Sequence, residues 1–148
     1  MIEDIFNYFK IDNRIGTAGQ PKIDQFAAIA DAGYQAVINL ALPTSDNAIP
    51  NEGSIVSSFG MTYVHLPVDF EKPKVTDFET FSAIMNSLGD QKVFVHCAMN
   101  MRVSAFVYMY RVRHLNVSRK SAAEQLHQLW HPDQTWQRLI DEVLGKTE

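Results

Sequence analysis

A single cysteine and an arginine five positions later carry the clearest chemical signal in this chain. Cys97 is the only cysteine, and it follows a short apolar segment over residues 92–96. A brief loop leads from it to Arg102 and Ser104, which open an apolar helical segment. A thiol between a strand and a helix N-terminus faces unpaired backbone N–H groups and the positive end of the helix dipole. Such a setting stabilises a thiolate and binds an oxyanion such as phosphate, so the pattern predicts cysteine-dependent phosphoryl transfer.

Arg102 is the residue expected to bind the anion. The residues that follow it are mostly apolar, so a guanidinium there needs an anionic partner or a route to solvent. Its planar fork matches a phosphate in bidentate fashion. Two simpler interpretations stay open: Cys97 as a small buried hydrophobe and Arg102 as a solvated surface residue.

Composition limits the class of protein. The length of 148 residues predicts a single domain over residues 1–148, large enough to bury a core without disulfides. Lys and Arg number 13 against 17 Asp and Glu, and the net charge of −4 disfavours nucleic acid or an anionic membrane as the partner. One cysteine excludes an intrachain disulfide and a multi-cysteine zinc site. The acidic N-terminus, the free thiol and the lack of a long apolar run predict a cytoplasmic protein.

Short apolar segments alternate with amphipathic ones along the chain. Strands are expected at 36–40, 61–66 and 92–96, the second of them in the core, and helices at 21–33, before 60, from 76, from 102, from 118 and from 132. Thr76-x-x-Glu79 is interpreted as a capping box that starts the third of these helices. The alternation predicts an α/β fold with a central, mostly parallel sheet of about four strands and helices on both faces. Ligands in such folds bind at the carboxyl ends of strands, where Cys97 and the loop 67–75 are both expected.

The cysteine loop resembles a known signature. His96-Cys97 followed by Arg102 and Ser104 is similar to the signature loop of the cysteine-based protein tyrosine and dual-specificity phosphatases. The usual loop has five residues between cysteine and arginine, whereas this one has four and lacks the usual glycine. A loop that cradles phosphate needs a residue at positive φ, and Asn100 is the best non-glycine candidate.

The resemblance extends over most of the chain, from about Arg14 to Leu144. Thr17-Ala18-Gly19-Gln20-Pro21 and Val37-Ile38-Asn39-Leu40 resemble the opening of a bacterial phosphatase-like branch of that superfamily. Leu66-Pro67-Val68-Asp69 resembles the start of its mobile acid loop. The resemblance implies the dual-specificity-phosphatase-like fold and a phosphatase.

The resemblance also implies a two-step reaction through a phosphocysteine. Cys97 would be the nucleophile, and Ser104 would donate a hydrogen bond to the departing thiolate. His96 would orient the loop through its ring N–H. The phosphate oxygens would be held by Arg102 and by the loop amides, which belong to Ala98, Met99, Asn100 and Met101.

A general acid is required for the leaving oxygen. Asp69 is the first candidate because it follows a strand and Pro67 on a charged loop. Glu71 is the second candidate. Asp77 and Glu79 have a local explanation in the expected cap.

No cofactor or metal is expected. His127 and His131 are four residues apart, but no third ligand is placed with them. The expected partner is a phosphorylated substrate, a protein or aryl phosphomonoester, with no nucleic acid and no membrane. Ala98, Met99 and Met101 add no positive charge, which disfavours highly phosphorylated lipids or inositols.

Two other functions stay open. A rhodanese-type sulfurtransferase also has a cysteine loop at a strand end, and a four-residue gap to arginine is common among such proteins. A catalytically weak module that binds phosphate without turnover is the other alternative. The Gly19-Gln20-Pro21 segment and Asp69 favour the phosphatase.

Overall fold

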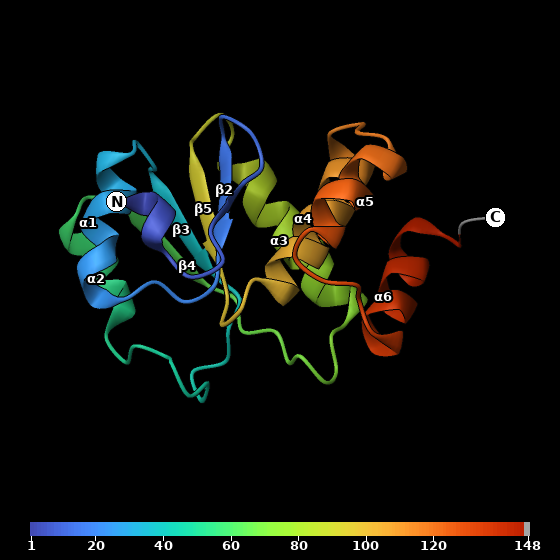
Figure 1. Cartoon of the computed structure of the whole chain (residues 1–148), viewed down its shortest axis with the longest axis horizontal. Helices are drawn as coiled ribbons and strands as arrows, with labels where there is room; N and C mark the ends of the chain where they lie inside the picture. The colour runs from blue at the N-terminus through green and yellow to red at the C-terminus, as the bar shows by residue number, and fades with distance from the viewer. Residues whose placement is uncertain (147–148) are drawn as a thin grey trace.

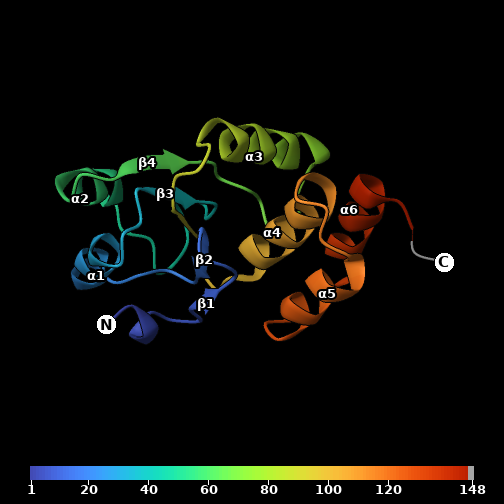
Figure 2. The same cartoon turned by 90° about the horizontal axis from the view of Figure 1, so that it is seen from above.

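The computed structural model describes residues 1–146 and contains one sheet between two layers of helices (Figures 1 and 2). The strands, in the order β1-β2-β5-β3-β4 across the sheet, are β1 (Phe9–Lys10), β2 (Ile15–Ala18), β5 (Val93–His96), β3 (Ala36–Asn39) and β4 (Thr62–His65). β2, β5, β3 and β4 are mutually parallel, and β1 pairs antiparallel with β2 at one edge. The α/β fold expected from the sequence is confirmed, with five strands in place of about four.

Helices cover both faces of the sheet. The layer seen with the N-terminus in Figure 2 contains α1 (Phe26–Asp31) and α2 (Glu52–Ser58), together with the 3-10 turns η1 (Ile2–Asp4) and η2 (Ile23–Gln25). The opposite layer contains α3 (Val75–Ser87), α4 (Met101–His114), α5 (Arg119–His127) and α6 (Gln134–Leu144). No helix within residues 1–146 is long and apolar enough to cross a membrane.

Successive side chains of the central strands pack alternately into two separate hydrophobic cores, one on each face of the sheet. Val37 and Phe94 pack with the residues of α1 and α2, whereas Ile38 and Val95 pack with those of α3 to α6. All four are completely buried, and side chains of this size each stabilise a fold by about 1.5–3 kcal/mol when removed from water. This two-sided burial explains why the segments read as continuous apolar runs in the sequence.

The register of the sheet aligns the ends of four strands. His96 pairs with Ala18 of β2 and with Asn39 of β3, and Asn39 pairs in turn with His65 of β4. Cys97 therefore emerges from the middle of the carboxyl edge, where ligands bind in parallel sheets.

Three expectations about individual elements are corrected. The strand expected in the core at 61–66 is the edge strand β4, whose side chains are exposed or half-buried. The paired strands β1 and β2 were not among the expected elements. The helix α3 begins at Val75, and its first turn is closed by Asp77, whose side chain accepts from the backbone N–H of Lys74 at 3.1 Å. The capping box assigned to Thr76 and Glu79 is therefore wrong.

Candidate active site

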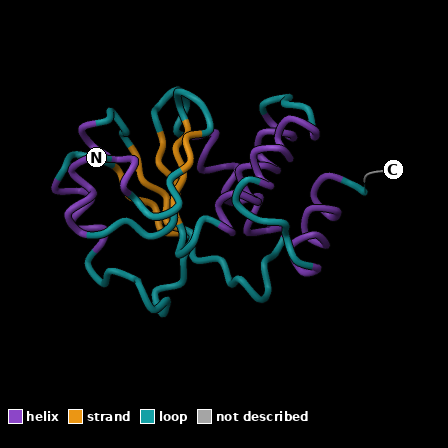
Figure 3. The backbone as a smooth tube through the Cα atoms, viewed as in Figure 1, coloured by secondary structure: helices purple, strands orange, loops and turns teal. Residues whose placement is uncertain are grey.

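Three loops meet at the carboxyl edge of the sheet. The segments that follow β3, β4 and β5 all lie on the lower side of the molecule in Figures 1 and 3. Arg102 Nη1 donates to the carbonyl oxygen of Val68 at 3.0 Å, which joins the cysteine loop to the loop after β4. Asn47 Nδ2 donates to the carbonyl oxygen of Ala98 at 3.3 Å, which joins it to the loop after β3. Arg102, the residue that directly follows the loop 97–101, thus links it to the loop 67–75, as expected.

The turn of the cysteine loop depends on Asn100. This residue has φ of 68° and ψ of 14°, in the left-handed region that the missing glycine would have occupied. Its side chain is buried and donates to the carbonyl oxygen of Asn7 at 2.9 Å and to Thr17 Oγ1 at 3.1 Å. The prediction that Asn100 supplies the positive φ is confirmed, and these two bonds hold it there.

The backbone of the loop turns its carbonyl groups toward the protein. The carbonyl of Ala98 accepts from the backbone N–H of Gln20 at 3.1 Å, in addition to Asn47. The carbonyl of Met99 accepts from Asn7 Nδ2 at 3.1 Å. By contrast, the backbone N–H groups of residues 98–103 donate to no acceptor within residues 1–146. A row of free N–H groups ahead of a helix is the arrangement that binds an anion.

Cys97 lies at the start of this row and is 1% exposed. Its own N–H donates to the carbonyl oxygen of Ala18 on β2 at 3.4 Å. Gly19, the first residue after that strand, approaches the loop so closely that a Cβ there would lie 2.8 Å from the carbonyl oxygen of Ala98. A glycine is therefore required at this point for the cysteine loop to pack against the segment after β2.

Arg102 is buried inside the site rather than solvated at the surface. Its exposed fraction is 7%, and its guanidinium carbon lies 5.9 Å from the centre of the Phe70 ring. One of its terminal nitrogens binds Val68, and Nε has no hydrogen-bond partner within residues 1–146. A buried guanidinium with donors to spare is suited to a bound anion.

Ser104 occupies a different environment from the one its expected role requires. Its hydroxyl donates to the carbonyl oxygen of Met101 at 3.0 Å and accepts from Trp130 Nε1 at 3.0 Å. Because the hydroxyl proton is donated to Met101, a hydrogen bond to a departing thiolate at Cys97 would need that proton to reorient, and this role stays a prediction.

Both candidate acids are exposed on the loop after β4. Asp69 Oδ1 accepts from the backbone N–H of Glu71 at 2.9 Å. Asp69 also directly follows Val68, the residue bound by Arg102. Along the chain, Asp69 is therefore closer than Glu71 to the contact between Arg102 and Val68.

One residue of the site, Glu52, is not indicated by the sequence. It lies in the first turn of α2, is 3% exposed, and its Oε2 lies 2.6 Å from His96 Nε2. Its Oε1 accepts from Gln20 Nε2 at 2.7 Å. Burial alone would raise the pKa of Glu52, but the hydrogen bond and the charge of His96, with smaller contributions from Gln20 and Tyr63, hold the pKa below its usual value. No sequence signal marks a glutamate in a short helix as the partner of a histidine 44 positions away.

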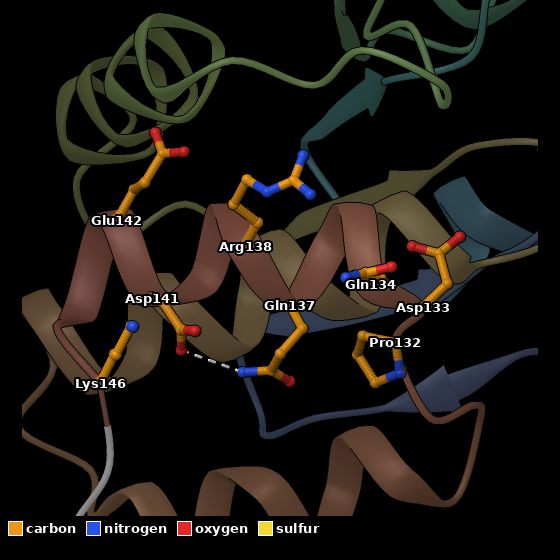
Figure 4. Close-up of a pocket in the computed structure, with 8 residues that line it drawn as sticks. All are labelled: Pro132, Asp133, Gln134, Gln137, Arg138, Asp141, Glu142 and Lys146. Atoms are coloured by element: carbon orange, nitrogen blue, oxygen red, sulfur yellow. Dashed lines mark hydrogen bonds between the residues drawn. The ribbon is translucent and has the colours of Figure 1, made fainter.

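The surface beside the cysteine loop is hollowed. A cavity of about 520 Å³ is lined by Leu42, Thr44, Ser45, Asp46, Asn47, Ala98 and Met99. Met99 is 49% exposed there, and Asp46 is the one charged side chain among those lining residues. A second open hollow, of about 490 Å³, is lined by residues of α6 and its flanks and shares no residue with this site (Figure 4). The first hollow is therefore the one placed to receive the part of a ligand that extends beyond the loop.

Fold and site together define the protein-tyrosine-phosphatase-like class. Over residues 7–140 the sequence matches the family described as a DSP-PTPase phosphatase fused to NAD+ kinase. The chain belongs to this family, and it is a phosphatase. The sequence matches none of the curated proteins with which it was compared.

Solved structures agree with this assignment. A DUF442 protein from Shewanella putrefaciens CN-32, suggested to be a phosphatase, is 34% identical with a TM-score of 0.86, covering 96% of this chain and 93% of that one. Tk-PTP in its active form is 18% identical with a TM-score of 0.78, covering 93% and 95%. PTPMT1 in complex with PI(5)P is 18% identical with a TM-score of 0.76, covering 92% and 93%. The last two show the shared fold.

Proposed function

We propose that this chain is a single-domain, cysteine-dependent phosphomonoester hydrolase of the cytoplasm that acts through a phosphocysteine intermediate. The observation that carries the proposal is the cysteine loop itself. Its carbonyl groups are bound from outside, its N–H groups from 98 to 103 have no acceptor within residues 1–146, and Arg102 is buried beside them. A phosphoryl group with three equatorial oxygens suits this set of donors.

In the first step the Cys97 thiolate attacks phosphorus as the bond to the leaving oxygen breaks. Asp69 gives its proton to that oxygen, so that an alcohol or phenol departs. In the second step Asp69 takes a proton from water, the water oxygen attacks phosphorus, and the S–P bond breaks. The products are inorganic phosphate and the Cys97 thiolate, which Ser104 would stabilise by a hydrogen bond.

The substrate class follows from the charges around the loop. The loop residues Ala98, Met99 and Met101 are uncharged, and Asp46 is the one charged side chain that lines the hollow beside the loop. A second phosphate that reached the hollow beside the loop would meet Asp46 and no cation among its lining residues. A protein or aryl phosphomonoester is therefore favoured over a highly phosphorylated lipid or inositol.

One observation favours a second candidate, a phosphate-binding module with weak turnover. Arg102 already donates to Val68, and this bond competes with a bidentate contact to phosphate. The rhodanese alternative has no comparable support, because its sulfur transfer makes no use of Asp69.

The test is hydrolysis of an aryl phosphate by the purified protein in EDTA, with vanadate as inhibitor. Phosphate release that vanadate blocks supports the hydrolase. Binding of inorganic phosphate without turnover would instead identify the module, and thiocyanate formation from thiosulfate and cyanide would identify a rhodanese. A requirement for a divalent ion would reject the cysteine mechanism.

A further inference from the structure

Two open hollows meet beside the cysteine loop. The first, of about 520 Å³, lies against Met99 of that loop. The second, of about 420 Å³, is lined by Phe6 and by residues that follow β2, among them Ile23. Asn47 lines both hollows, and its Nδ2 donates to the carbonyl oxygen of Ala98 at 3.3 Å. The two hollows therefore form one groove that starts at the cysteine loop and runs toward the N-terminal segment.

The groove gathers exposed apolar side chains. Six large apolar side chains are exposed within residues 1–146, and three of them, Phe6, Ile23 and Met99, line the groove. Their exposed fractions are 49%, 60% and 49%. Single apolar residues on a surface are normal, whereas several together beside a reaction site mark a place that a ligand covers. The ligand of this groove therefore has an apolar part at some distance from its phosphate.

Each hollow also has one charged side chain, and the two charges are opposite. Asp46 is the charged residue that lines the first hollow, and Lys22 is the one that lines the second. Both side chains are exposed, and neither forms an ion pair within residues 1–146. A ligand lying along the groove thus meets a carboxylate in the hollow next to the cysteine loop and an ammonium group in the hollow beyond it.

These features fit a peptide better than an acyl chain. Thr44, Ser45 and Asn47 place hydrogen-bonding groups in the first hollow. Asn47 Oδ1 accepts no hydrogen bond within residues 1–146, although it stands between the two hollows, and a backbone N–H of a bound peptide supplies a donor for it. An acyl chain would cover this oxygen and the carboxylate of Asp46 without a partner, which costs free energy.

We propose that the groove binds the segment of a protein substrate beside its phosphorylated residue, and that it selects a basic side chain near that residue and an apolar one farther away. The inference rests on the proposed function, because it names the substrate class of the same site. The basic side chain would face Asp46, the apolar one would lie against Phe6 and Ile23, and an acidic group next to it would meet Lys22. Exposed ion pairs contribute little affinity, so the apolar contact gives the larger part of the selectivity.

The test compares phosphotyrosyl peptides of equal length. The patterned peptide has lysine, leucine and glutamate, in this order, leading away from the phosphotyrosine, with glycine and serine on its other side. It is made with this pattern before or after the phosphotyrosine, because the groove admits either chain direction. Exchanging lysine and glutamate should lower kcat/KM about fivefold in the better direction. Replacing leucine by serine should lower it about tenfold.

Two variants test whether the groove is the source of this selectivity. Ile23→Asn should lower the ratio of kcat/KM on the patterned peptide to kcat/KM on phenyl phosphate about tenfold. Asp46→Lys should reverse the preference between the patterned and the exchanged peptide. The matched controls are Leu115→Asn, at an exposed leucine directly after α4, and Asp90→Lys, at an exposed aspartate before β5. Both controls should leave the ratio and the preference unchanged.

Binding to Cys97→Ser separates this inference from the proposed function. Fluorescence anisotropy should show tighter binding of the patterned peptide than of the exchanged one, whether or not the wild type turns over. Selective binding without turnover by the wild type would reject the phosphatase and support the groove.

The opposite result would overturn the groove and leave the phosphatase. It is equal kcat/KM on all three peptides by a protein that hydrolyses phenyl phosphate. A single-chain acyl ester of glycerol 3-phosphate supplies the other comparison. Faster hydrolysis of this lipid than of every peptide, lost in Ile23→Asn and unaffected by Asp46→Lys, would overturn the inference in favour of an acyl chain.

Discussion

The cysteine loop and the acid loop face the same site but are held in opposite ways. The cysteine loop, residues 97–101, is bound by side chains and backbone from the N-terminal segment, from β2 and from the loop after β3. The acid loop, residues 66–74, has its charged side chains in solvent. Its first residues are held by backbone bonds from Leu66 and Val68 to Asn39 and Leu40, and two of its carbonyls accept from distant side chains. Arg102 binds that of Val68, and Trp136 Nε1 binds that of Phe70 at 3.0 Å.

The difference separates two kinds of chemical task. A nucleophile and its anion cradle gain from fixed geometry, because donors aimed in advance need no reorganisation during the reaction. An acid must reach a leaving group whose position varies with the substrate, so a solvated side chain between two fixed carbonyls suffices. Substitutions in the cysteine loop are therefore expected to affect all substrates, and substitutions in the acid loop only some of them.

The largest effect is expected for Cys97→Ser. Turnover of any phosphomonoester should fall on the order of 10⁵-fold, because the serine alkoxide forms far less readily than the thiolate. Inorganic phosphate should still bind, since the loop N–H groups and Arg102 remain. Isothermal titration of phosphate together with rates on an aryl phosphate checks both statements. A serine variant that keeps most of its activity would rule out Cys97 as the nucleophile.

Asp69→Asn is expected to slow hydrolysis of phenyl or tyrosyl phosphate by roughly 10²–10⁴-fold. It should do much less harm with a strongly electron-poor phenol, which departs without a proton. Rates on a series of aryl phosphates against leaving-group acidity measure this selectivity. Glu71→Gln serves as the comparison on the same loop. If the selective loss appears in Glu71→Gln instead, the acid is Glu71.

Arg102→Lys tests the bond between the two loops. A lysine ammonium lacks the planar fork that can hold two phosphate oxygens while another nitrogen donates to Val68, so kcat should fall by about 10²–10³-fold. The matched control is Arg138→Lys, in the hollow on α6, which should leave kcat unchanged (Figure 4). Equal kcat in Arg102→Lys and the wild type would show that Arg102 only holds the loop.

Substitutions at Asn100 test how much the fixed turn of the cysteine loop contributes to the free energy of unfolding. Asn100→Ala should lower the free energy of unfolding by about 2–4 kcal/mol. The alanine keeps a Cβ at φ of 68° but loses the two hydrogen bonds that hold Asn100 in this conformation. Asn100→Gly keeps the backbone conformation and should cost less. Urea denaturation of both variants gives the order, and a glycine variant less stable than the alanine one would contradict it.

The smallest effect concerns acid stability. Because the pKa of Glu52 is lowered on folding, its ionised form contributes stability that is fully present above the ordinary value of 4.5 and is lost as the pH falls through the lowered value. Glu52→Gln should therefore show a weaker fall in unfolding free energy through that acid range than the wild type. Denaturation at a series of acidic pH values measures the two slopes, and equal slopes would contradict the assignment.

The sequence predicted those parts of the site that depend on local patterns. The position of Cys97 between a strand and a helix follows from apolar periodicity, and the positive φ of Asn100 follows from the short list of residues that tolerate it. The helices expected from 118 and from 132 are confirmed as well. Ser118 and Asp133 cap them, because each side chain accepts from the backbone N–H three residues later.

The missed features depend on contacts between distant segments. Glu52 meets His96 only because α2 packs on the neighbouring strand β4, and nothing in the residues around Glu52 indicates that packing. β2 was overlooked because its four residues, Ile15–Ala18, include a glycine and a threonine and carry no long apolar run. The false cap at Thr76 arose because Asp77, two residues before Glu79, reaches the N-terminus of the helix first.

The contact between Asn7 and the cysteine loop makes the first few residues part of the catalytic scaffold. Asn7 donates to Met99 and accepts from Asn100, and the carbonyl of Phe6 accepts from Gly19. Through these hydrogen bonds, motion of the first residues would change the position of the cysteine loop about 90 residues later in the chain. Removing residues 1–7, or pulling on them through a fused domain, would release the loop on the side opposite Arg102 while leaving every proposed catalytic side chain in place.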